Sequence, residues 1–128
     1  MVDADTVRRL AMALPEAEDL SEPPRLDLKV AGKGFAWSYL ARVAPKQPRV
    51  VVPEVVAIRC ELHRKELLIE AAPDTFFDDD HYRGFPAVLA RLATLDEPEL
   101  AALLASAWRL RAPKKLVAAH PEVGSSAR

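Results

Sequence analysis

The residues of this chain that could do chemistry are few, and the densest group is a run of acids followed by a histidine. Asp78, Asp79, Asp80 and His81 offer carboxylates and an imidazole, which are ligand types for divalent metals. Contiguous ligands on one loop cannot all face a single ion, and no second group of ligands follows at a recognisable spacing. We therefore expect the acids to cap turns and His81 to have a structural contact, with no metal site.

Nucleophilic catalysis would need a serine, threonine or cysteine beside a base. Cys60 follows a run of β-branched residues, where cysteine acts as a small hydrophobic side chain. His63 lies among Arg64, Lys65 and Glu66, which indicates a solvated helix face. Gly32-Lys33-Gly34 has neither the spacing nor the following helix of a phosphate-binding loop. The sequence thus predicts no catalytic residues and no cofactor, and we interpret the chain as non-catalytic.

Positive charge is concentrated in two segments, although the formal net charge of the whole chain is −1. No acid occurs from Leu28 to Pro53 or from Leu100 to Pro121. Lysines and arginines in these segments could neutralise nucleic-acid phosphates, and a solvated helix face is the alternative interpretation for those near residue 110. The candidate nucleic-acid contacts are Lys29, Lys33, Arg42, Arg109, Arg111, Lys114 and Lys115.

Length and composition are typical of one globular domain, because 128 residues with 50% hydrophobic content can form one contiguous core. We expect this domain to span residues 1–120, followed by a flexible tail at 121–128. The first ten residues carry acids and arginines where a signal peptide would need an apolar segment, and no apolar run approaches the roughly 18 residues of a membrane span. The expected location is the cytoplasm.

Hydrophobic periodicity predicts the elements of the first half of the chain. Apolar residues at helical spacing predict a short helix within residues 3–15, with Asp3 or Asp5 as its N-cap and Pro15 as its stop. Alternating patterns at 26–30 and 35–40, separated by glycines, predict an antiparallel hairpin. Its second strand would carry one aromatic face, expected to lie on the core: Phe35, Trp37 and Tyr39.

The second half is predicted to begin with a main strand at Val55–Cys60, with Pro53 marking an edge or a bulge. A helix follows at 61–71, and then a strand at 87–92. Asp96 opens a third helix with a capping-box-like D-x-x-E, and a short last helix is expected around 114–119. The third helix should bury an apolar stripe formed by Leu100, Leu103, Leu104, Ala107 and Leu110.

The predicted order of elements is helix, hairpin, strand, helix, strand, helix, without a long βαβ alternation. This order is typical of an α+β two-layer sandwich, in which helices pack on an antiparallel sheet of about four strands.

Three stretches taken together carry a family resemblance: APDTFFDDDHY from Ala72, RGFPAVLARL from Arg83, and AWRLRAPKKL from Ala107. With this wording and order the chain resembles the MmcQ/YjbR family of small bacterial proteins, described as DNA-binding with a double-wing motif. The resemblance implies a double-wing α+β fold and DNA as partner, but assigns no DNA contact to a particular residue. The alternative is a domain that binds another protein or a small ligand, including a homodimer formed through a sheet edge or the helix bearing Trp108.

Overall fold

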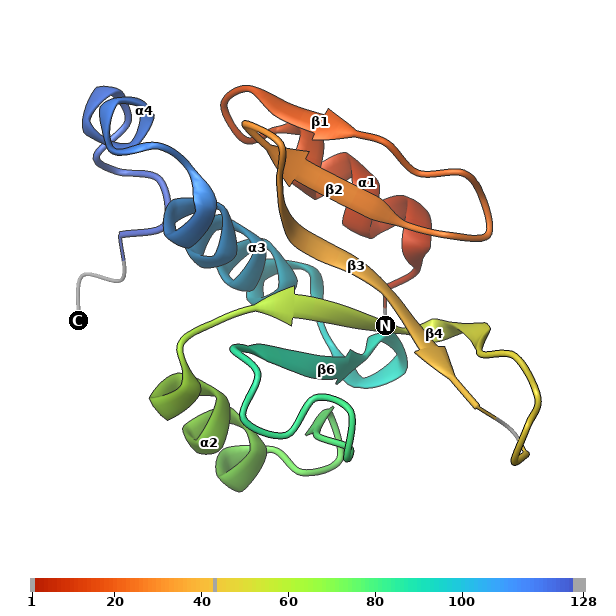
Figure 1. Cartoon of the computed structure of the whole chain (residues 1–128). Helices are drawn as coiled ribbons and strands as arrows, with labels where there is room; N and C mark the ends of the chain where they lie inside the picture. Colours follow the sequence, from red (N-terminus) through yellow and green to blue (C-terminus); the bar gives the residue numbers. More distant parts are fainter. Residues whose placement is uncertain (1, 43, 126–128) are drawn as a thin grey trace.

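The structure is a computed structural model that describes residues 2–42 and 44–125. Within these residues, four α-helices accompany a six-stranded antiparallel sheet of order β1-β2-β3-β4-β6-β5 (Figure 1). In chain order the elements are α1 (Ala4–Met12), β1 (Ala17–Asp19), β2 (Asp27–Val30), β3 (Lys33–Ala41), β4 (Val50–Arg59), α2 (Leu62–Ala71), β5 (Phe76–Phe77), β6 (Ala87–Arg91), a 3-10 turn (Leu92–Thr94), α3 (Glu97–Arg111) and α4 (Lys114–Ala119). The predicted α+β class is therefore confirmed, and the predicted elements occur in the predicted order with two further short strands, β1 and β5.

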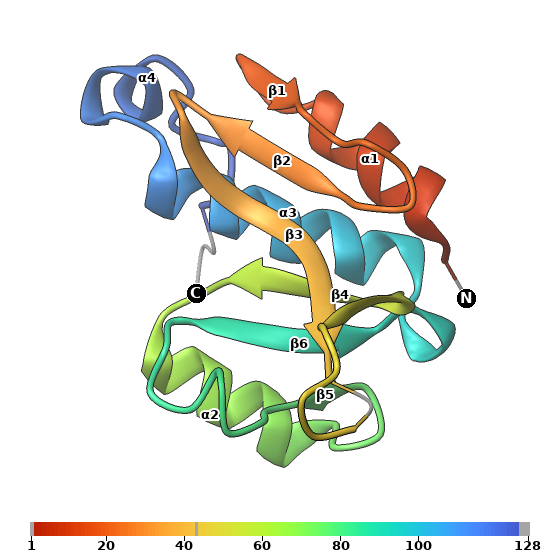
Figure 2. The same cartoon turned by 45° about the vertical axis from the view of Figure 1, so that its right-hand side comes forward.

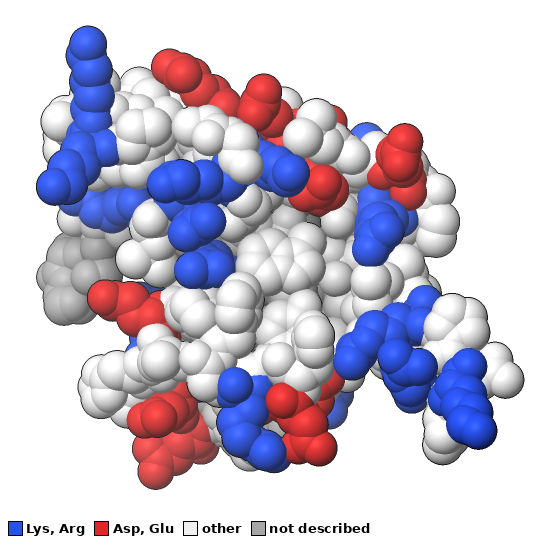
Figure 3. Space-filling view, in the orientation of Figure 1, with Lys and Arg blue, Asp and Glu red and all other residues white. Residues whose placement is uncertain are grey.

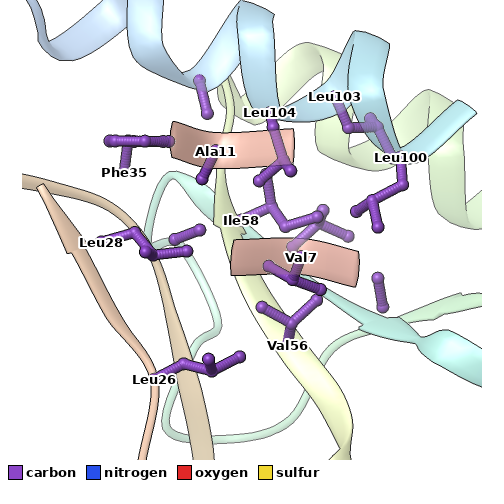
Figure 4. Packing of buried hydrophobic residues seen from close by; sticks show 14 of the residues in the cluster. Val7, Ala11, Leu26, Leu28, Phe35, Val56, Ile58, Leu100, Leu103 and Leu104 are labelled. Carbon is purple, nitrogen blue, oxygen red and sulfur yellow. The ribbon is translucent and has the colours of Figure 1, made fainter. Parts of the chain in front are cut away.

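Helices α1 and α3 cover one face of the sheet, and α2 packs at its β5–β6 edge (Figure 2). The main core fills the space beneath α1 and α3. Figure 4 shows how it is built: Val7 comes from α1, Leu104 from α3, and Leu28, Phe35 and Ile58 from the strands, all fully buried. The helix-covered side of the sheet is thus a continuous apolar layer.

The helix boundaries follow the capping chemistry that the sequence predicts. The Asp3 side chain accepts a hydrogen bond from the backbone N–H of Thr6 at 2.9 Å and caps α1. Asp96 accepts from the N–H of Glu99 at 2.8 Å, so the predicted start of the third helix is confirmed. In the β2–β3 turn, Ala31 and Gly32 have φ values of 50° and 77°, the positive φ pair that a tight hairpin requires.

A β-bulge changes the predicted faces of β3. Leu28 pairs with Ala36 but Lys29 pairs with Gly34, so Phe35 is an extra residue on β3. Phe35 points into the main core, whereas Trp37 and Tyr39 pack on the opposite side of the sheet. The prediction that all three aromatic residues share the core face is wrong, because the bulge breaks the alternation of side chains after Phe35.

The sheet has two more strands than the predicted four, and both are very short. β1 has three residues and β5 has two, too few to produce a periodic pattern. β4 also begins earlier than the predicted main strand, at Val50, and passes through Pro53. The register moves from Ser38↔Val56 to Leu40↔Val51, so Pro53 lies in an irregular stretch, as expected for a bulge.

The apolar stripe of α3 departs from the prediction at its end. Trp108 is fully buried and its indole Nε1 donates to the carbonyl of Pro15 at 2.8 Å, whereas Leu110 is 46% exposed. The buried side continues from Leu104 through Trp108 to the Nε atom of Arg111, at the four- and three-residue spacing of a helix face. Leu110 therefore belongs to a different surface, described below.

The first part of the predicted flexible tail contacts the domain. Arg109 donates to the carbonyl oxygens of Pro121 and Val123 at 3.2 and 3.1 Å, and Val123 packs against the core. The domain thus extends beyond residue 120, because this segment satisfies a guanidinium on α3. Residues 126–128 of the predicted tail lie outside the described residues. No helix in the described part of the chain is long and apolar enough to cross a membrane.

The two leucines of α3 allow a direct test of this packing. Leu104→Ala should lower the free energy of unfolding by about 2–5 kcal/mol, because it leaves a cavity in the core. Leu110→Ala, on the same helix, should cost less than about 1 kcal/mol because the side chain is largely exposed. Urea denaturation followed by circular dichroism measures both, and equal losses would contradict the assigned orientation of α3.

Candidate functional site

Cations from six separate elements meet at one end of the sheet. Because Lys29 pairs with Gly34, and Ala36 pairs with Ile58, the β2–β3 turn and the end of β4 lie at the same end. The C-terminal part of α3 and the start of α4 adjoin this end (Figure 1). We call the basic end the cluster formed by Lys29, Lys33, Arg59, Arg64, Arg109, Arg111, Lys114 and Lys115.

Six of the seven predicted contact residues fall in the basic end, and Arg42 does not. Lys33 and Arg42 flank the length of β3, so they are about 30 Å apart at the usual rise per residue. Arg59 and Arg64 were not predicted, because their segment also contains Glu54 and Glu61 and so is not free of acids. The pairing of β4 with β3 is what brings them to this end, and a linear charge pattern does not contain that information.

One face of the molecule displays two groups of positive charge (Figure 3). The first lies over α4 and the β2–β3 turn, and the second over the connection between β3 and β4, whose cations are Arg42, Lys46 and Arg49. Arg42 donates to the carbonyl of Gln47 at 2.6 Å, and Arg49 to that of Leu40 at 3.2 Å. These two hydrogen bonds join the two ends of the β3–β4 connection.

The cations of both groups lack ion-pair partners. In residues 2–42 and 44–125, the ion pairs join Arg8, Arg9, Lys65 and Arg83 to acids, and none involves the basic end or the β3–β4 connection. Lys29 is half-buried and in register with Glu18 on β1, so it is less available than the exposed Lys33, Lys114 and Lys115. The remaining positive charge is therefore not neutralised by side chains of the described residues.

A pocket of about 740 Å³ opens within the basic end, and we call it the basic pocket. It is lined by Arg59, Arg64, Arg109 and Lys114, together with Cys60. Burial, and then the nearby charge of Arg111, lower the pKa of Arg59. Burial raises the pKa of the Cys60 thiol to about 11, so the thiol is protonated near neutral pH and is not activated as a nucleophile.

The sheet face opposite α1 and α3 carries an aromatic cluster, formed by Trp37, Tyr39, Phe77, Tyr82 and Phe85. The Trp37 indole Nε1 donates to the hydroxyl of Tyr82 at 2.9 Å, and Tyr39 donates to Asp79 at 2.6 Å. Phe85 is 39% exposed, meets Trp37 edge-to-face, and has the Arg59 guanidinium 5.0 Å above its ring centroid. This contact makes the aromatic cluster continuous with the basic end.

A second pocket, of about 420 Å³, is lined in part by Trp37. Its lining includes Tyr82, His81, Arg25 and Arg49, but also the acids Glu22 and Asp27. Its charge is therefore mixed, in contrast to the basic pocket.

The carboxylates of the loop formed by residues 78–81, which we call the acidic loop, each contact a different partner. Asp78 pairs with Lys65, Asp80 pairs with Arg83, and Asp79 accepts from the backbone N–H of Tyr82 at 2.8 Å. His81 meets the Tyr82 ring edge-on. These contacts agree with the expectation that the acids cap turns. In the described part of the chain, no group of three or more His, Cys, Asp and Glu side chains is arranged to hold a metal ion.

Lys65 holds this loop in place, although the sequence pattern indicated a solvated helix face. Its side chain is 4% exposed and its Nζ lies 3.0 Å from a carboxylate oxygen of Asp78, whose side chain is 31% exposed. The same Nζ donates to the carbonyls of Tyr82 and Phe85 at 2.7 and 3.1 Å. The predicted solvated position of Lys65 is wrong because the loop folds over α2, a long-range contact that helical spacing cannot indicate.

The fold and this surface define a small α+β protein whose sheet has a helix-covered face, a face with an aromatic cluster, and a basic end. A family model described as YjbR matches residues 12–110, and the chain belongs to the YjbR family. Uncharacterised proteins of Mycobacterium bovis and Mycobacterium tuberculosis are 31% identical over 126 residues, covering 93% of this chain and 95% of theirs. A crystal structure of a Deinococcus radiodurans protein with a DUF419 family-model domain superposes with a TM-score of 0.62 at 21% identity, covering 86% of this chain and 78% of that one. The last likeness concerns the fold.

Replacing the buried lysine tests its role in the loop. Lys65→Met removes three partners of the ammonium group, so we expect the free energy of unfolding to fall by about 2–3 kcal/mol. Amide hydrogen exchange in residues 79–86 should also become faster. Lys46→Met, at an exposed position, is the matched control and should change stability by less than about 0.5 kcal/mol. If both variants behaved alike, the loop would not depend on Lys65.

The tyrosines give a pH signature of the aromatic cluster. Burial, and then the hydrogen bond to Asp79, raise the pKa of Tyr39 to about 12, and burial raises the pKa of Tyr82. Above pH 10 the unfolded chain loses a proton that folded Tyr39 retains, so stability should fall as the pH rises from about 10 to 12. Ultraviolet titration of the native protein should show that Tyr39 ionises at a higher pH than an ordinary tyrosine, whose pKa is about 10. Asp79→Asn should move the pKa of Tyr39 toward that ordinary value. An unchanged titration in Asp79→Asn would contradict the assigned hydrogen bond.

Proposed function

We propose that this protein binds duplex DNA through the phosphate backbone and catalyses no reaction. The basic end supplies the main contact, and the β3–β4 connection supplies a second. The supporting observation is the presence of two groups of unpaired cations on one face, about 30 Å apart along β3. One turn of duplex DNA has a similar length, about 34 Å, so a single duplex can meet both groups.

The individual cations suit phosphate contacts. Lys33 lies at a tight hairpin turn, and Lys114 and Lys115 are exposed at the start of α4. Binding of such side chains to phosphates releases counterions and needs no base recognition. The net charge of −1 means that the attraction comes from the local arrangement of charge, so binding should depend strongly on salt. The double-wing description of the family agrees with a protein that presents two hairpin connections to DNA.

The non-catalytic part of the proposal has its own support. The Cys60 thiol is held protonated by burial, and the acids that precede His81 are engaged with Lys65, Tyr39 and Arg83. The proposed location is the cytoplasm, because the relatives come from bacteria and bacterial DNA lies in that compartment.

Fluorescence anisotropy with a labelled random-sequence duplex of 20 base pairs tests the main contact. Lys33→Gln combined with Lys115→Gln should weaken binding about tenfold and reduce the slope of log K against log salt by about 2, because up to two phosphate contacts are lost. Arg9→Gln is the control, since Arg9 lies on α1 at the opposite face and already pairs with Glu97. Absence of binding at low salt, or equal effects of both changes, would refute the proposal.

The second contact makes affinity depend on duplex length. Arg42→Gln should weaken binding to the 20-base-pair duplex severalfold, because the β3–β4 connection then loses a phosphate contact. On a duplex of eight base pairs, shorter than the distance between the two groups, Arg42→Gln should bind like the unaltered protein. A loss of equal size on both duplexes would show that the two groups do not contact one duplex together.

A further inference from the structure

The basic pocket has the dimensions of a small-molecule site. It lies between the end of β4, the first turn of α2, the last turns of α3, and α4. Its volume of about 740 Å³ falls within the range of about 300–1,000 Å³ that is common for ligand pockets. A pocket of this size accepts a small molecule or the end of a single strand, but not the side of a duplex.

The charges around this pocket are unbalanced. Four cations line it, and Glu61 is the acid among its described lining residues. None of the four forms an ion pair in the described part of the chain. Burial, and then the like charge of Arg111, lower the pKa of Arg59. An anion would relieve this repulsion, so the folded protein is arranged to favour one.

Two neighbouring groups also lack partners. The Nε atom of Arg111, which lies between the lining residues Leu110 and Ala112 in the sequence, is buried and has no hydrogen-bond partner among the described residues. The Glu61 side chain does not cap α2, so the N–H groups of the first turn of this helix are not satisfied by it. Their partial positive charge adds to that of the cations.

Most of the remaining lining residues are apolar, and they explain why one hydrophobic side chain is exposed. Leu103, Leu110, Val117 and Ala118 contribute to the pocket. Leu110, which departs from the buried stripe of α3, is exposed because it lines this cavity. A ligand that fits the pocket therefore combines an anionic group with an apolar part.

We propose that the basic pocket binds a phosphomonoester, with its phosphate between Arg59 and Arg64 and its organic group against Leu110 and Val117. Planar guanidinium groups bind phosphate oxygens in pairs, and several cations together favour a doubly charged group over a carboxylate. The ligand is either a free phosphorylated small molecule or the phosphorylated 5′ end of a single strand. The pocket lies within the basic end, but Lys33 and Lys115, whose replacement tests the duplex contact, are not among its lining residues.

Calorimetric titration with phenyl phosphate, inorganic phosphate and phenol tests the chemistry of the ligand. Phenyl phosphate should bind more tightly than inorganic phosphate because of the apolar lining, and phenol should not bind. Arg59→Gln and Arg64→Gln should each weaken phenyl phosphate binding about tenfold through loss of a charge-assisted hydrogen bond. Arg9→Gln, on α1 and already paired with Glu97, is the control and should have no effect. Arg109 is left intact because it holds the carbonyls of Pro121 and Val123.

Protonation of the ligand gives a second readout. The second pKa of a phosphomonoester is about 6, so binding should be weaker at pH 5 than at pH 7 if the dianion is bound. Circular dichroism of each variant confirms that a loss of binding is not a loss of fold.

Single-stranded oligonucleotides with a 5′ phosphate or a 5′ hydroxyl distinguish the two sources. A preference of about tenfold for the 5′ phosphate, abolished by Arg59→Gln, would assign the pocket to strand ends. Phenyl phosphate binding without such a preference would assign it to a free small molecule. The proposal would be overturned if phenyl phosphate did not bind and the 5′ phosphate gave no preference, or if Arg9→Gln weakened binding as much as Arg59→Gln. These outcomes leave the duplex measurements unaffected, so either proposal can fail alone.

Discussion

The bulge at Phe35 determines how the two faces of this sheet differ. By adding one residue to β3, it turns Phe35 into the core beneath α1 and α3 while Trp37 and Tyr39 face the other side. A regular strand would place all three rings on one face, and the main core would have to accommodate two more aromatic side chains. The helix-covered layer and the aromatic cluster thus depend on one local irregularity.

The second constraint is the buried ammonium group of Lys65. A cation in this environment is stable only if its hydrogen bonds are satisfied, and two backbone carbonyls and Asp78 do so. The loop that supplies these oxygens also places Tyr82 against Trp37 and Phe85 beside Arg59. The position of the aromatic cluster, and its contact with the basic end, therefore depend on a polar interaction beneath it.

The sequence predicts well what local chemistry decides. Asp96 and Asp3 cap helices because their carboxylates lie three residues before an unsatisfied N–H, and the hairpin forms where Gly32 permits positive φ. The face of Trp37 could not be predicted, because a bulge depends on pairing between strands. For the same reason the charge pattern identified most of the basic end but omitted Arg59 and Arg64, which β-sheet pairing brings there. The length of β3, not any motif, separates Arg42 from the other candidates.

The distribution of ion pairs distinguishes stability from function in this protein. Acids are paired where they fix elements, as with Arg8 and Asp19 between α1 and β1, or Lys65 and Asp78 beneath the loop. The basic end has the reverse arrangement: burial and the like charge of Arg111 lower the pKa of Arg59, and the Nε of Arg111 is buried without an acceptor among the described residues. Such a cluster opposes folding, since like charges are brought together and desolvated. The proposed anion would supply to this cluster what Asp78 and two backbone carbonyls supply to the buried ammonium group of Lys65.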